Sequence, residues 1–307
     1  MADVILDAPI APAPAKPSAV FRGLVHNPAV LFGGTVIAIV LLMALLAPWL
    51  GTIDPTAINP IARNKVPGAE FFFRTDTGER IKMVAWFGTD GLGRDVYSRV
   101  VYGARVSLLV GVAVALISIV CGLLIGLLAG FFRILDAIIM RIMDGLMAIP
   151  AILLAIAMVS LFRSSVWTVI IAITVPQVPG VVRLVRSIVL SVREEPYVEA
   201  AVTLGTSTPK LLWRHVLPNT IAPMIVQGTF ICASAILVEA ILSFLGIGVP
   251  PEVPTWGNIM AEGRQVFSLF PHNIIYPGVF LAMTILAVNI LGDGLRDTLD
   301  PKMMKRV

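Results

Sequence analysis

The sequence predicts an all-α protein that crosses a membrane with six helices. Of its 307 residues, 57% are hydrophobic and only 14% are charged, and the mean hydropathy is +0.91. A soluble domain usually has about 25% charged residues. Apolar runs of the size needed to cross a bilayer, about 20 residues, recur along the chain. The polar faces that a large soluble enzyme needs at these positions are missing.

The predicted membrane spans follow the runs without charged residues, and Arg163 separates the third run from the fourth. The six spans are Ala29–Leu50, Val106–Phe132, Gly145–Phe162, Ser164–Val182, Val216–Val238 and Ile274–Leu291. A long mixed segment, 51–103, separates the first span from the others. We therefore expect the five later spans to form a helical core over residues 104–296.

The two ends of the chain, 1–28 and 297–307, are predicted to be tails. The first 28 residues are rich in Ala and Pro, which favours disorder. They lack the early basic region and apolar run of a cleaved signal peptide. We therefore expect the first span to be an uncleaved anchor.

Charge and cysteine content argue against two kinds of binding. The net charge is +4, but the basic residues are scattered at span ends, where membrane topology places them, so we expect no nucleic acid. Cys121 and Cys232 lie in different predicted spans, without a CxxC or Cys/His spacing. We expect neither a metal site nor a disulfide from them.

The distribution of basic residues predicts that both chain ends are cytoplasmic. If the loop 183–215 is cytoplasmic, the segments on that side hold 13 Lys and Arg residues, against 10 on the other side. Without the long segment 51–105 the difference is 13 against 2. Because the positive-inside rule works best on short loops, we expect 51–103 and 249–273 to be extracytoplasmic loops. The first of these loops has a turn signal at Asp76-Thr77-Gly78, which favours a short hairpin.

A polar loop, about 191–220, lies between the fourth and fifth spans. Pro196, after two acidic residues, fits the first position of a short helix. Gly205 fits a left-handed stop at its end. Thr208 can cap a second short helix, and Leu217-Pro218 would close this unit before the fifth span. The loop is predicted to be a compact helix–turn–helix.

This loop resembles the "EAA…G…LP" docking loop of ABC-importer permeases. The residues that carry the resemblance are Glu199, Ala200, Ala201, Gly205, Leu217 and Pro218. The ending His215-Val216-Leu217-Pro218-Asn219 is similar to that of the peptide-importer branch. Two further segments resemble the same branch, namely Phe87–Asp95 ("FGTDxLGRD") and Leu242–Gly257 ("LSFLGLG…P.WG").

The resemblance implies a C-type permease subunit of the dipeptide/oligopeptide (peptide/nickel) ABC importer family, with a type I ABC importer permease fold. It implies a multi-pass protein of the bacterial inner membrane that imports di- or oligopeptides. Nickel, glutathione or another small solute stays open as the alternative cargo. The implied partners are a second permease, two ATPase subunits that bind ATP and Mg, and an extracytoplasmic solute-binding protein. The small face at Ala200 and Ala201 would seat in a cleft of an ATPase subunit.

No catalytic residue and no cofactor is predicted in this chain. It contains no Gly-Lys dipeptide and therefore no Walker A loop. An intramembrane enzyme would need a catalytic set, and neither Gly-x-Ser-x-Gly nor His-Glu-x-x-His occurs. A secondary transporter would show two related halves and polar residues in mid-span. The docking loop argues against a lone channel or scaffold.

Charged residues in or near the predicted spans are further candidates. Glu239 follows Ile221 by 18 residues, which places it about 27 Å along the fifth span, close to the outer interface. We expect it to reach water there, either as part of an outer gate or as a structural anchor. Arg141 is expected to pair with Asp136 or Asp144 at the inner end of the third span.

Small residues and prolines suggest how the spans pack. Gly122, Gly126 and Gly130 recur every four residues, which lets another helix approach closely. This stripe predicts either ordinary packing within the chain or a moving interface with a second permease. Pro150, among other prolines, is expected to kink or end a helix.

Overall fold

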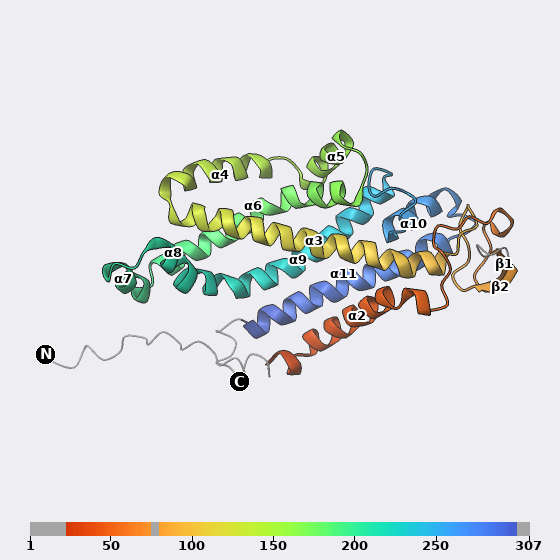
Figure 1. Ribbon diagram of the computed structural model, residues 1–307, viewed down its shortest axis with the longest axis horizontal. Helices are drawn as coiled ribbons and strands as arrows, with labels where there is room; N and C mark the ends of the chain where they lie inside the picture. Colours follow the sequence, from red (N-terminus) through yellow and green to blue (C-terminus); the bar gives the residue numbers. More distant parts are fainter. Residues whose placement is uncertain (1–22, 75–79, 300–307) are drawn as a thin grey trace.

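The computed structural model describes residues 23–74 and 80–299, which form a long bundle of helices (Figure 1). Within these described residues, five helices are long and apolar enough to cross a membrane. These are α2 (Pro28–Leu45), α3 (Val96–Phe131), α6 (Val166–Arg193), α9 (Leu217–Phe244) and α11 (His272–Leu299). They run along the long axis of the molecule, as expected when each crosses the same apolar layer.

The predicted third span is not one straight helix. Its residues, Gly145–Phe162, cover only the end of α4 (Arg133–Met147) and all of α5 (Ala151–Leu161), and these two helices are bent by 87° at the break between them. Pro150 stands in this break, and proline has no N–H for a helical hydrogen bond. The predicted number of six spans agrees with the structure when α4 and α5 are counted as one broken span, but this span begins at Arg133 and not at Gly145.

α3 begins ten residues before the predicted start of the second span at Val106. The Asp95 side chain caps the helix by accepting a hydrogen bond from the Ser98 backbone N–H at 2.8 Å. The polar residues Ser98 and Arg99 in its first turns are buried against other parts of the protein. Hydrophobicity alone misses this start, because a helix end packed inside the protein does not have to be apolar.

The glycine stripe packs inside the chain. A Cβ atom added at Gly126 or Gly130 would lie 2.7 or 2.6 Å from the Cβ of Val185 or Val189 on α6, and Gly122 faces Val181 in the same way. The residue numbers on both helices increase together, so α3 and α6 run parallel. This confirms the alternative of ordinary packing within the chain, and the alternative of an interface with a second permease at this stripe was wrong, because α6 already occupies it.

Two ends of the bundle carry different structures (Figure 1). At one end, β1 (Ala69–Arg74) and β2 (Arg80–Ala85) pair antiparallel, from Ala69 opposite Ala85 to Arg74 opposite Arg80. This confirms a hairpin, and the turn predicted at Asp76-Thr77-Gly78 lies outside the described residues. The short helix α10 (Trp256–Gly263) lies at the same end. α7 (Pro196–Thr203) and α8 (Thr208–Leu211) form the opposite end.

The acids of α4 do not pair with Arg141 as expected. Arg186 on α6 binds Asp136, with 2.6 Å between Nη2 and Oδ2, and Arg183 Nη2 lies 2.7 Å from Asp144 Oδ1. Arg141 lies on the same helix as both acids, but α4 turns the acids towards α6 and leaves Arg141 exposed. Long-range packing therefore decides which cation each acid meets.

Candidate functional site

The first helix of the docking loop is built as its sequence predicts. Pro196 begins α7, and Glu199 stands in its first turn. Gly205 ends it with φ of +76°. The Gly205 N–H donates to the Val202 carbonyl at 2.9 Å, and the Thr206 N–H donates to the Ala201 carbonyl at 3.0 Å. These two bonds form a Schellman motif, which confirms the predicted left-handed stop.

The second half of the loop differs from the prediction. Ser207, and not Thr208, is the residue before α8. A π-helical turn, Leu212–Val216, then joins α8 to α9, so that one apolar helical segment runs from Thr208 to Phe244. Pro218 does not close a separate unit, because a proline in the first turn of a helix breaks no hydrogen bond. The loop is therefore mechanically continuous with the fifth span.

The predicted small face of the loop is divided in the structure. Glu199, Ala200 and Gly205 are exposed, whereas Ala201 packs partly buried against the hydrophobic core. No atom lies within 4 Å of a Cβ built on Gly205. Pro218 is exposed at the start of α9, where Leu217 beside it is half-buried. The six predicted residues thus lie on one loop, but only some of them are available to a partner.

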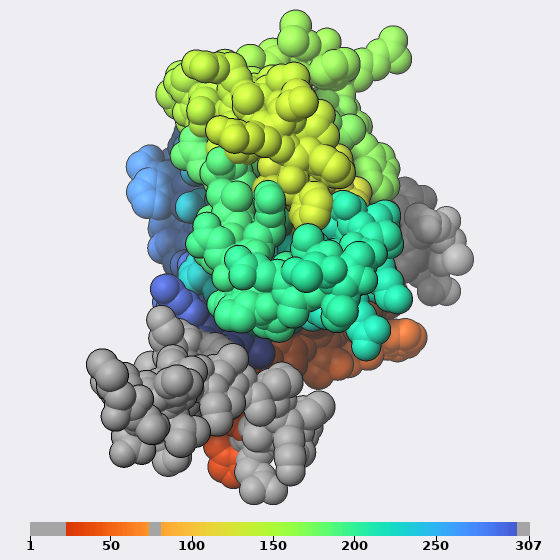
Figure 2. All heavy atoms as spheres, turned by 90° about the vertical axis from the view of Figure 1, so that its left-hand side faces the viewer, coloured from red at the N-terminus to blue at the C-terminus, as the bar shows by residue number. Residues whose placement is uncertain are grey.

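Exposed apolar side chains on this loop were missed in the sequence. Leu204 is 86% exposed and Trp213 is 76% exposed, with Val202 and Tyr197 also exposed nearby. Figure 2 looks onto this end of the molecule, where the residues of the loop form the green to teal surface. Large apolar groups on a loop at the end of a bundle are a signal of a protein contact. Their position in a polar stretch of the sequence could have revealed them.

Hydrogen bonds hold the loop against the bundle. Arg193 Nη1 donates to the carbonyls of Gly130 and Phe131 at 3.1 and 3.3 Å. Asn219 Nδ2 donates to the Tyr197 hydroxyl at 3.2 Å and so joins α9 to α7. The first half of the loop is therefore tied both to α3 and to the start of α9.

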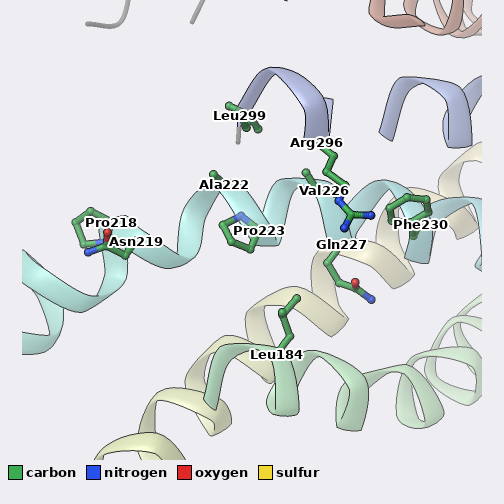
Figure 3. A pocket seen from close by; sticks show the side chains of 10 residues that line it. All are labelled: Leu184, Pro218, Asn219, Ala222, Pro223, Val226, Gln227, Phe230, Arg296 and Leu299. Carbon is green, nitrogen blue, oxygen red and sulfur yellow. The ribbon is translucent and has the colours of Figure 1, made fainter. Parts of the chain in front are cut away.

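A cavity of about 650 Å³ lies beside the loop, between α6, α9 and α11 (Figure 3). Its walls include Leu184 on α6, Asn219 and Gln227 on α9, and Arg296 on α11. Arg296 reaches from α11 towards α9 in Figure 3. The fifth span therefore has a hollow, partly polar face at this end of the molecule.

Glu239 is fully buried, and the expected contact with water is absent. Its Oε1 accepts a hydrogen bond from Ser243 Oγ at 2.8 Å, and Oε2 accepts one from Ser107 Oγ at 3.3 Å. Ser107 Oγ in turn accepts a hydrogen bond from the backbone N–H of Trp256 at 3.4 Å. These hydrogen bonds join α9, α3 and α10, as expected of a structural anchor. The role of Glu239 in an outer gate stays a prediction.

Substitution separates these two roles of Glu239. We expect Glu239→Gln to keep the thermal stability of the purified protein, because the amide can keep both serine contacts. Glu239→Leu should lose about 1–3 kcal/mol, because it leaves buried hydroxyls without this partner. Uptake that changes in the stable Glu239→Gln variant would support a gate. Equal stability of the Gln and Leu variants would contradict the anchor.

A buried charge network at the hairpin end connects the Phe87–Asp95 segment to α10. Asp90 Oδ2 lies 2.8 Å from Arg94 Nε and 2.7 Å from Arg99 Nη1. Both arginines also bind Glu262. Burial raises the pKa of the neighbouring Asp95 carboxyl, and hydrogen bonds from Ser98 oppose this effect. The Phe87–Asp95 segment is thus bound by ion pairs to α3 and α10 at the hairpin end of the bundle.

The comparisons with known proteins identify the family. Residues 100–305 match the model of the "binding-protein-dependent transport system inner membrane component". The chain belongs to this family. Residues 18–67 also match the N-terminal transmembrane domain of oligopeptide transport permease C. The protein is therefore a membrane component of an ABC transport system and not an enzyme.

Relatives of this permease carry names of transport systems. A probable peptide ABC transporter permease protein of Sinorhizobium fredii is 50% identical, over 92% of this chain and 91% of the relative. A dipeptide transport system permease protein of Alkalihalophilus pseudofirmus is 40% identical, over 92% and 89%. A glutathione transport system permease protein of Salmonella typhimurium is 42% identical, over 90% and 86%.

Proposed function

We propose that this permease imports di- or oligopeptides as one of two different permease subunits of an ATP-driven importer. Relatives named as peptide and dipeptide permeases support the cargo. The observation that carries the coupling is the single helical segment from Thr208 to Phe244, which joins the docking loop to the fifth span. Movement of the loop would move α9 directly.

The proposed assembly contains a second permease, two ATPase subunits and an extracytoplasmic solute-binding protein. ATP and Mg would bind to the ATPase subunits. The exposed Leu204 and Trp213, beside Ala200 and Gly205, supply the contact surface for one of them. Closure of the ATPase pair would displace α7 and α8, and α9 would carry this displacement to the solute path. Hydrolysis would reset it.

The proposed orientation puts the docking loop and both chain ends in the cytoplasm of a bacterial cell, with the hairpin outside the inner membrane. The excess of basic residues on the short segments of that side supports it. It also places the docking loop on the side where ATP is available.

Reconstitution tests the proposed function. We expect labelled dipeptide to enter proteoliposomes only when both permeases, the ATPases and the binding protein are present with internal ATP. This chain alone should give no uptake. ATP-driven uptake of glutathione in place of peptides, which the Salmonella relative favours as the second candidate, would contradict the peptide cargo.

The same liposomes report the orientation. An impermeant maleimide should label Ile58→Cys only from the binding-protein side and Lys210→Cys only from the ATP side, in a background without Cys121 and Cys232. Both Ile58 and Lys210 are exposed. The reverse pattern would overturn the orientation.

A further inference from the structure

An ion pair lies exposed deep within the membrane-spanning bundle. Arg183 on α6 and Asp144 on α4 are 2.7 Å apart, and their side chains are 47% and 58% exposed. Charged residues in membrane spans are costly and almost always face the protein interior or a water-filled cavity. An exposed pair therefore needs either water or another protein beside it.

The position of this pair along the bundle excludes the membrane surface. Arg183 precedes the end of α6 at Arg193 by ten residues, or about 15 Å at 1.5 Å per residue. Asp144 follows the start of α4 at Arg133 by eleven residues, or about 16 Å. α6 has 28 residues and is about 42 Å long, so its end at Arg193 extends beyond a hydrocarbon core of about 30 Å. A Cβ built on Gly126 meets Val185, so Arg183 is level with about residue 124 of α3, inside the charge-free run 106–132. The pair therefore lies inside the core, in the half nearer the docking-loop end.

The break between α4 and α5 lies next to this ion pair and is also exposed. The residues from Asp144 to Pro150 are exposed except for Leu146. A helix end leaves its last carbonyl groups without helical partners. Irregular backbone at membrane depth is tolerated only where protein buries it or where it lines a water-filled cavity. The break therefore also needs water or another protein beside it, and this conclusion does not depend on the ion pair.

The neighbouring face of α6 is open and polar. Gly180 and Ser187, one turn to either side of Arg183, are both exposed, and no atom lies within 4 Å of a Cβ built on Gly180. Leu184, beside Arg183 in the sequence, lines the cavity shown in Figure 3. By contrast, another side of α4 exposes apolar residues that can contact lipid, namely Ile134, Ile138 and Ile142.

We propose that the break between α4 and α5, together with the α6 face formed by Gly180, Arg183 and Ser187, lines the water-filled solute path, with the second permease across it. This inference rests on the proposed function, because a path between two permeases provides both the water and the second protein wall. The Arg183–Asp144 pair fixes α4 to α6 beside the path, so its charges stay solvated without contact with lipid.

Cysteine accessibility in the assembled complex tests this assignment. In a chain with Cys121→Ser and Cys232→Ser, the variants Ser187→Cys and Ala148→Cys should react quickly with a charged methanethiosulfonate reagent. Leu128→Cys is the matched control, because Leu128 on α3 is exposed and lies at the same depth as Ser187. We expect it to react at least about tenfold more slowly, because a thiol in lipid forms little thiolate.

Three outcomes decide the proposal. Fast reaction at residues 148 and 187 but not at 128 supports the path. Slow reaction at both test positions overturns it, and so does equal reaction at all three. Ser187→Cys is nearly isosteric, so misfolding would not explain a slow reaction there, and copurification of the partner subunits checks assembly. Because labelling needs no transported solute, failure of this inference can be distinguished from failure of the peptide cargo.

Discussion

Replacement of Gly205 by glutamate is expected to abolish transport while leaving the permease folded. The left-handed φ of +76° at this position costs a side chain about 1–2 kcal/mol, which is too little to unfold the bundle. Apart from its chain neighbours, no atom of the described residues lies within 4 Å of a Cβ built there, so the new side chain would project from the exposed turn into the proposed contact with an ATPase subunit. A charge left unpaired in an interface costs about 2–5 kcal/mol. We therefore expect the affinity for the ATPase to fall by roughly 30-fold or more.

Copurification and ATP hydrolysis measure this effect. The Gly205→Glu permease should still insert and pair with its partner permease, but should lose the ATPase subunits or their stimulation by substrate. Gly205→Ala is the control, since it has the same backbone strain without bulk or charge, and it should stay near wild type. Glu199→Ala should be milder, because it removes a polar group but keeps the shape of α7. Full uptake and full stimulation in the glutamate variant would show that this loop does not transmit the ATPase movement.

Removal of the Asp90 carboxylate should destabilise the hairpin end of the permease more than any exposed charge there. Asp90→Ala leaves Arg94 and Arg99, which are 6% and 1% exposed, with Glu262 as their shared acid. Removing one partner from a buried ion pair costs about 3–5 kcal/mol, because the remaining charge stays desolvated. The first visible result should be loosening of the Phe87–Asp95 segment from the start of α3, because Asp90 joins that segment to Arg99.

Thermal unfolding and limited proteolysis of the purified permease check this prediction. The matched control is Lys82→Ala, which breaks the exposed ion pair with Glu70 at the same end. An exposed pair contributes less than about 1 kcal/mol, so this control should unfold as wild type does. Proteolysis of Asp90→Ala should begin near the hairpin, while the docking-loop end stays resistant. Equal stability of the two variants would show that the buried network contributes nothing to this end.

Properties that depend on neighbours in the chain could be predicted from the sequence. Apolar runs predicted the long helices, because a bilayer demands about 20 apolar residues wherever a helix crosses it. The stop at Gly205 was predictable because a left-handed turn favours glycine. The residues of the docking loop and the family were also recognisable from one continuous motif, Glu199 to Pro218.

Properties that depend on residues distant in the chain were decided only by the tertiary structure. Arg183 meets Asp144 across 39 positions, and Arg94 meets Glu262 across 168. Glu239 lacks its expected water contact because it is buried where α9 meets α3 and α10. Ser107 of α3 donates a hydrogen bond to Glu239, and the backbone N–H of Trp256 in α10 donates one to Ser107. The sequence by itself determined which segments enter the membrane and where local turns stop. Which faces those helices bury depends on how they pack, since each charged or small side chain contacts whichever helix lies beside it.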